Sequence, residues 1–156
     1  MVSSKVEIKE EALKNCLDEM KPIFDLHWDE VAIHKENIKL NPDYDRYLQM
    51  ADDGSIKAYI ARENGKLIGY AIFIISYNLH YKDHVYAHND IVYLSKDYRG
   101  SGLAVKLFKI AELELKENYN VDVINVSMKV TLPFDDLMKY LGFEYIERTH
   151  SKFIGD

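Results

Sequence analysis

Residues 88–117 hold the feature that most constrains the fold: a strand-like run, a short glycine turn and an amphipathic helix, in that order. Residues 91–94 are apolar and include β-branched and aromatic members, which is typical of a mostly buried strand. Gly100 and Gly102 lie in the turn. After the turn, apolar residues recur at helical spacing, at Leu103, Leu107, Ile110 or Ala111, and Leu115. This order predicts a strand–turn–helix unit around which the rest of the chain is organised.

The glycine turn is a candidate site for phosphate groups. A turn that enters a helix exposes unpaired backbone N–H groups, and the helix dipole favours an anion there. Gly100 and Gly102 permit positive φ and let a ligand approach the backbone closely. An ordinary tight turn explains the same spacing, so this alternative stays open. A dinucleotide-binding loop fits less well, because Val105 stands where its third glycine would be and no βαβ unit precedes it.

This stretch resembles the acyl-CoA signature of the GNAT family, the GCN5-related N-acetyltransferases. The family pattern is Gln or Arg, two residues, Gly, one residue, and Gly or Ala; Arg99, Gly102 and Ala104 fill its fixed positions. The lead-in also resembles the family's, with Lys96 replacing a common proline. The resemblance extends over nearly the whole chain, as in small bacterial or phage members, and implies acetyl-CoA as donor. The residues it assigns to acetyl-CoA are Leu94, Arg99, Gly100, Ser101, Gly102, Leu103, Ala104 and Val126.

The chain is expected to be a single α/β (α+β) domain over residues 1–156. Asn64-Gly65 predicts a hairpin, and Pro22 is expected to end or kink the first helix. Besides residues 84–94, strands are predicted over residues 3–8, 56–62, 66–76, 121–130 and 143–154. Besides the helix after Gly102, helices are predicted over residues 10–20, 41–51 and 132–141, with residues 23–39 partly helical. The order predicts a mixed, mostly antiparallel sheet with helices on both faces, and the resemblance implies a GNAT fold with splayed fourth and fifth strands.

Acetyl transfer to an amine requires that the amine lose its proton and that the developing oxyanion meet a preorganised donor. In the family the amine attacks the thioester directly. The resemblance implies that the backbone N–H of Leu94 faces the thioester oxygen, and that Leu94 and Val126 flank the slot for the pantetheine arm. It also places a general base six residues before Leu94, which in this chain is His88.

Histidine suits this role because its unperturbed pKa is near ~6.5. In a regular strand His88, Asp90, Val92 and Leu94 share one face, so Asp90 is expected to orient the imidazole or to act through water. The alternative is that His88 is an ordinary, partly exposed strand residue. A stripe of His80, His84 and His88 resembles metal ligands, but no motif supports a metal and none is expected.

A general acid is harder to assign. Met138 occupies the position at which the family often carries a tyrosine, and Tyr140 is expected on another side of the helix. Tyr93 or water is an alternative acid, and a thiol that ionises near ~8.5 leaves readily without one.

The charge of the chain bears on its partners. The net charge is −6, and eight carboxylates lie between residues 25 and 53 against three basic residues. Such a surface attracts a cationic amine, although a merely solvated surface is an equal alternative. The same acidity argues against direct nucleic-acid binding. Without a signal pattern or an apolar run of ~20 residues, a cytoplasmic protein without membrane contact is expected. Cys16 has core spacing and is expected to be buried.

The sequence therefore predicts an acetyl-CoA-dependent N-acetyltransferase that acts on the primary amine of a small cationic molecule or a protein lysine, as a monomer or homodimer. A non-catalytic, CoA-binding or regulatory module of the same fold is one alternative. A transferase that uses another acyl donor is another.

Overall fold

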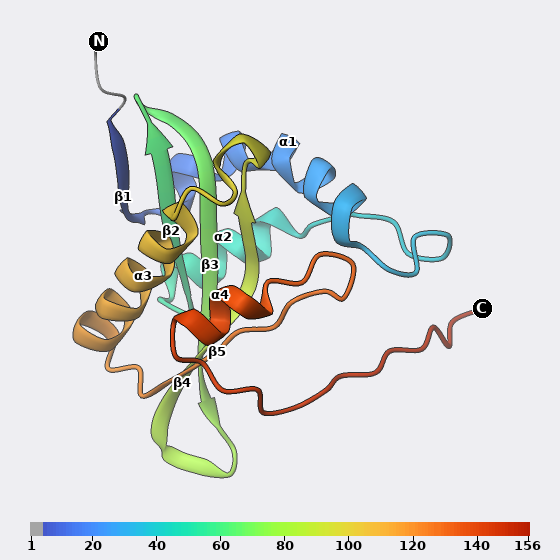
Figure 1. The fold of residues 1–156 in the computed structure, drawn as a ribbon. Coiled ribbons are helices and arrows are strands. Elements are labelled where there is room, and N and C mark those ends of the chain that lie inside the picture. The colour runs from blue at the N-terminus through green and yellow to red at the C-terminus, as the bar shows by residue number, and fades with distance from the viewer. Residues whose placement is uncertain (1–4) are drawn as a thin grey trace.

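The computed structural model describes residues 5–156 and contains a five-stranded mixed sheet with helices on both faces (Figure 1). The strands lie in chain order; the first four pair antiparallel with one another, and the fifth is parallel to the fourth. This confirms the predicted fold class. The strands are β1 (Val6–Glu11), β2 (Ile56–Glu63), β3 (Lys66–Asn78), β4 (Tyr81–Leu94) and β5 (Val123–Asn125). The helices are α1 (Leu13–Val31), α2 (Tyr44–Asp52), the short 3₁₀ helix η1 (Lys96–Tyr98), α3 (Leu103–Tyr119) and α4 (Asp135–Tyr140).

The core has two halves, one on each face of the sheet. Helices α1 and α2 cover one face, where Phe24, Tyr70 and Ile72 are buried together. Helices α3 and α4 cover the other face, where Phe73 and Leu107 are buried. Successive residues of β3 thus supply both halves, as expected of a strand buried on both faces.

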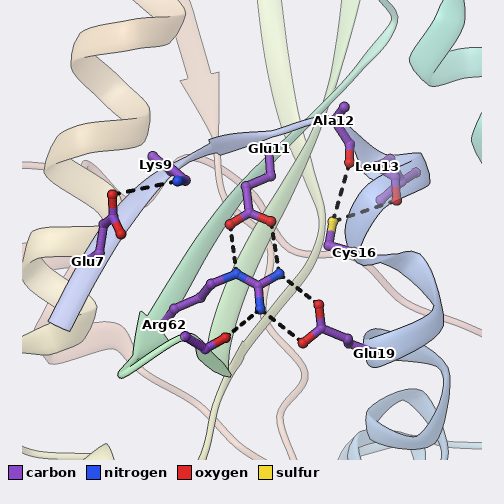
Figure 2. Close-up of polar contacts among 9 residues, drawn as sticks. Glu7, Lys9, Glu11, Ala12, Leu13, Cys16, Glu19 and Arg62 are labelled. Atoms are coloured by element: carbon purple, nitrogen blue, oxygen red, sulfur yellow. Dashed lines mark hydrogen bonds and ion pairs between the residues drawn. The ribbon is translucent and has the colours of Figure 1, made fainter. Parts of the chain in front are cut away.

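Arg62 of β2 ties the first strand and the first helix to the sheet (Figure 2). Its Nε and Nη2 donate to the carboxylate of Glu11 in β1, at 2.7 and 2.9 Å. Its Nη1 and Nη2 donate to the carboxylate of Glu19 in α1, at 2.9 and 2.7 Å. Next to this cluster Cys16 is 1% exposed, which confirms the prediction that it is a core residue.

The Asn64-Gly65 hairpin is confirmed, with both residues at positive φ. Pro22 was predicted to end or kink the first helix, and it does not end it. The buried face of α1 continues past Pro22 to Phe24, and the helix runs to Val31. Helix α2 is capped by Asp43, whose carboxylate accepts the Arg46 N–H at 2.9 Å, and so begins later than predicted.

The strands after the hairpin also differ from their predicted bounds. β3 continues to Asn78 and β4 begins at Tyr81, so the predicted connection over residues 77–82 is mostly strand. The tyrosines near its ends favour strand structure. The predicted strand over residues 121–130 is reduced to β5, and the helix over residues 132–141 to α4.

The predicted strand over residues 143–154 is wrong. These residues form an extended, largely exposed segment that leaves the end of α4 (Figure 1). The short β5 offers only three residues for a further pairing. Of the first predicted strand, residues 3–4 lie outside the described residues, and β1 continues beyond it to Glu11.

Candidate active site

An extra residue in β4 decides which helix layer each of its side chains faces. Ile91 pairs with Ile72 of β3, while Asn89 pairs with Phe73, so Asp90 is inserted between neighbouring pairs as a β-bulge. Side chains of a strand alternate between faces, so one inserted residue reverses the alternation on its far side. The two halves of β4 are therefore out of phase.

The bulge makes the prediction that His88, Asp90, Val92 and Leu94 share one face wrong. His88 lies on the α1/α2 face, because its β3 partner packs against that core. Val92 and Leu94 face α3. Asp90 lies beside α2, where the hydroxyl of Tyr47 donates a hydrogen bond to its carboxylate. The two candidate bases thus lie on the α1/α2 side of the sheet, and the side chain of Leu94 lies on the opposite side.

The contact between Tyr47 and Asp90 was not predicted from the sequence, because the spacing of Tyr47 indicated an ordinary core residue. Burial, and then its hydrogen bond to Asp90, raise the pKa of Tyr47 well above its usual range. The phenol therefore stays protonated and acts as a donor to the carboxylate. His88 is exposed, and its ring is nearly parallel to that of Tyr86 with centroids 6.3 Å apart.

β4 and β5 separate soon after they meet. Within the described residues they pair only where Tyr86, Ala87 and His88 lie beside β5. The side chain of Asn89 then bridges the two segments: Nδ2 donates to the carbonyl oxygen of Ser127 at 2.9 Å, and Oδ1 accepts the Ser127 N–H at 2.6 Å. Past this bridge the remainder of β4 runs on without pairing to β5. Val126 packs against the α3/α4 core at the point of separation.

The backbone N–H of Leu94 points into the gap that this separation leaves. The N–H of the next residue, Ser95, donates to Ile68 of β3 at 2.9 Å. Backbone groups of successive residues point to opposite edges of an antiparallel strand. The Leu94 N–H is therefore directed away from β3, toward the side from which β5 has diverged, as a donor to a ligand in the gap needs to be.

The glycine turn leads from this gap to the start of α3. Gly100 and Gly102 have φ of 78° and 82°, and a Cβ on either would meet no atom within 4 Å. Gly102 is the N-cap of α3, a 17-residue helix, so backbone N–H groups and the positive end of the helix dipole face open space. The Ser101 hydroxyl caps the turn by donating to the carbonyl of Tyr98 at 2.5 Å. The turn therefore fits the phosphate groups of a nucleotide-like ligand.

Arg99 is engaged by the protein itself. Its Nε donates to the carbonyl oxygen of Leu94 at 2.8 Å, and its two terminal nitrogens donate to the Glu30 carboxylate at 2.9 and 3.0 Å. The hydrogen bond from Arg99 lowers the pKa of Glu30. The side chain thus fixes the end of α1 and the peptide of Leu94. The prediction that Arg99 contacts acetyl-CoA therefore rests on its backbone.

The other predicted features are as follows. Met138 is 7% exposed in the α3/α4 core and Tyr140 is 72% exposed. Nδ1 of His84 lies 3.3 Å from Oδ2 of Asp122. Residues 5–156 hold no group of three His, Cys, Asp or Glu side chains that could bind a metal. No helix in the described part of the chain is long and apolar enough to cross a membrane.

The acidic segment is only partly available to a ligand. Glu30 is paired with Arg99, and Asp43 and Asp53 accept hydrogen bonds from backbone N–H groups. The remaining carboxylates are exposed on or near α1 and α2, the helices that flank Asp90: Asp25, Asp29, Glu36, Asp45 and Asp52.

Comparison with known proteins adds a family and a set of folds. A family model described as the acetyltransferase (GNAT) family matches residues 18–143. A GCN5-related N-acetyltransferase from Ralstonia eutropha JMP134 is similar in structure, with a TM-score of 0.78 and 14% identity over 97% of this chain and 100% of that one. A predicted acetyltransferase with acetyl-CoA from Clostridium acetobutylicum gives a TM-score of 0.70 and 18% identity over 96% of each chain.

A third similar structure is an aminoglycoside acetyltransferase in complex with sisomicin, from an uncultured soil metagenomic sample. Its TM-score is 0.72, with 12% identity over 96% of this chain and 95% of that one. At these identities the structures share the fold and nothing finer. No curated protein sequence matches this chain.

Proposed function

This chain belongs to the GNAT family of acetyltransferases, whose acetyl donor is acetyl-CoA, and on that premise we propose that it acetylates a primary amine by direct attack. One observation carries the proposal. The part of β4 that is not paired with β5 leads from the bulge at Asp90 to the glycine turn that opens α3, and the N–H of Leu94 on the way points into the gap between the two strands. Donors for a carbonyl oxygen and for phosphates thus follow one another along a single open edge.

Each part of this edge has a distinct task. Acetyl-CoA, when bound, supplies the activated acetyl thioester. The Leu94 N–H donates to the oxygen on which negative charge develops, and its peptide is held in place by Arg99 through the carbonyl. The backbone N–H groups around Gly100 and Gly102 bind the anionic end. Met138 is buried and has no acidic proton to donate. Thiols ionise near ~8.5, so the thiolate can leave without a general acid.

His88 is the proposed general base. It is exposed on the α1/α2 face, the face on which Asp90 and the exposed carboxylates of the two helices also lie. A histidine can accept the proton of an amine at neutral pH and release it to solvent. Asp90 is the alternative base, and the two differ in the effect of their removal on the pH–rate profile.

The acceptor is proposed to be cationic, a small amine or a lysine side chain. The acceptor is placed on the α1/α2 face, where the exposed carboxylates on and near these helices create a negative field and raise the local concentration of cations. Such steering weakens with salt, because the Debye length falls to ~8 Å at physiological ionic strength and further above it. We therefore expect kcat/KM for the acceptor to fall as salt is added.

The test is release of free thiol from acetyl-CoA across polyamines, lysine peptides, aminoglycosides and neutral amines, with the acetylated product identified by mass spectrometry. We expect rapid release with at least one cationic primary amine, and a decline of kcat/KM with salt. A protein that binds CoA but acetylates none of these amines would instead be the non-catalytic module. A preferred neutral acceptor with salt-independent kcat/KM would refute the cationic class.

A further inference from the structure

We propose that Asp90 binds the ammonium group of the acceptor, with Tyr47 as the residue that positions its carboxylate. This inference rests on the proposed function, since it specifies how the same site selects its acceptor.

The first observation is the way in which Asp90 is presented. As the inserted residue of the bulge, it lies out of the regular β3–β4 register and is exposed on the α1/α2 face. The hydroxyl of Tyr47 reaches it from α2, which is 43 residues away along the chain. Tyr47 is itself fixed by packing, with its ring 6.2 Å from that of Phe24. The carboxylate is therefore held in one orientation, and less side-chain entropy is lost when a ligand binds it.

The hydrogen bond leaves Asp90 with acceptor capacity. An ionised carboxylate has two oxygens and about four lone-pair sites, of which the Tyr47 hydroxyl occupies one. Because burial and the bond to Asp90 raise the pKa of Tyr47, the phenol remains a neutral donor and does not add a competing negative charge. A group that offers several N–H donors and a positive charge complements the remaining sites, and a primary ammonium offers both.

The second observation is the packed support beneath Tyr47. The ring of Phe24, which contacts Tyr47, lies 6.0 Å from that of Tyr70, and the Tyr70 ring lies 5.6 Å from that of Tyr93. Tyr70 is fully buried on the α1/α2 face, so a ligand at the exposed Asp90 does not contact it. This packed layer fixes Tyr47 and, through its hydroxyl, the carboxylate of Asp90.

The site therefore selects a protonated amine and discriminates against neutral groups of the same shape. It separates two tasks, holding the ammonium and removing its proton. Asp90 holds the ammonium, and the proton is lost to His88.

The experiment is calorimetric titration of putrescine into protein saturated with CoA, with 1,4-butanediol as the uncharged probe of similar length. We expect saturable binding of putrescine and none of the diol. Asp90→Asn should weaken putrescine binding about 10- to 100-fold, the usual scale of a lost charge-assisted hydrogen bond. Tyr47→Phe, which keeps the packing, should weaken it about three- to tenfold and raise the acceptor KM without changing that of acetyl-CoA. The matched control is Asp136→Asn, an exposed aspartate of α4 on the other face, which removes the same charge and should change nothing.

Wild-type affinity in Asp90→Asn, an equal loss in Asp136→Asn, or no putrescine binding by the wild type would each overturn the ammonium site.

These failures are distinguishable from failure of the proposed function. CoA is titrated first, and a protein that does not bind CoA refutes the acetyltransferase proposal. The putrescine titration of the CoA-free protein then still decides whether Asp90 binds an ammonium.

Discussion

Replacing Arg62 by methionine is the sharpest test of what holds the first helix on the sheet. The change removes a guanidinium that donates to two carboxylates and to the carbonyl of Gly65, while the apolar stem is largely kept (Figure 2). Glu11 and Glu19 are left facing each other without a cation. The Arg62 and Glu11 side chains are only 16% and 12% exposed, so water cannot fully replace the lost partner.

The magnitude follows from these exposures. Removing one partner of a buried ion pair costs about 3–5 kcal/mol. The Glu11 half of the cluster belongs to this class, whereas Glu19 is 46% exposed and behaves as a surface pair worth at most about 1 kcal/mol. We expect Arg62→Met to lower the free energy of unfolding by about 3–5 kcal/mol. In a domain of this size that corresponds to a fall in Tm of roughly 10 °C.

The loss should depend on pH. The hydrogen bond from Arg62 lowers the pKa of Glu19 in the folded state, so its stabilisation is present above the unfolded value of ~4.3 and is lost as pH falls through the folded value. The difference between the wild-type and Arg62→Met proteins should therefore be larger near neutral pH than in acid, by the roughly 1 kcal/mol of the Glu19 pair.

Urea unfolding followed by circular dichroism measures both effects. Arg62→Lys, which keeps a charge but loses the planar guanidinium, should have an unfolding free energy between those of the wild type and Arg62→Met. Adding Glu11→Gln to Arg62→Met should recover part of the loss, because the stranded carboxylate is removed. A loss below about 1 kcal/mol in Arg62→Met would show that this cluster does not hold α1 in place.

Three further predictions concern the site. Removing His88 by alanine substitution should lower kcat by about 10²- to 10⁴-fold, leave CoA affinity unchanged and abolish the acidic limb of the pH–rate profile; near-normal kcat with that limb intact would exclude it as the base. Asn89→Ala breaks the bridge to Ser127 and should raise KM for acetyl-CoA more than KM for the amine, and an unchanged KM for acetyl-CoA would show that the bridge does not shape the slot. Glu30→Gln should lower the unfolding free energy by about 1–2 kcal/mol in a urea titration, because the neutral amide loses the charge and one of the two acceptor oxygens of the bidentate pair with Arg99; no loss would contradict a holding role for this pair.

Features encoded in consecutive residues were predictable from the sequence. Asn64-Gly65 has the turn chemistry of a hairpin, and Gly100 with Gly102 at the end of an apolar run indicated the turn into α3. The apolar spacing around Cys16 likewise placed it in the core. In each case the determining interaction lies within a few residues.

Features that depend on distant partners were not predictable. An inserted residue leaves the composition of a strand almost unchanged, so the bulge at Asp90, and with it the facing of His88, had no sequence signal. The pairing of Arg99 with Glu30 joins residues 69 apart, and the same arginine satisfies a ligand-binding pattern. Residues 143–154 were predicted to form a strand, yet a strand forms only where another segment offers an edge.

The central claim is that the glycine turn at the start of α3 binds the phosphates of acetyl-CoA, and calorimetric titration of CoA into Gly102→Val tests it most directly. The added side chain would project into open space beside the turn, where the phosphates are expected. Gly54→Val is the matched control, because Gly54 has a φ of 84° and equally open surroundings but follows α2, so both variants carry the same backbone strain. The account predicts that Gly102→Val weakens CoA binding at least tenfold (~1.4 kcal/mol) while Gly54→Val binds like the wild type. A folded Gly102→Val protein with wild-type affinity for CoA would contradict it.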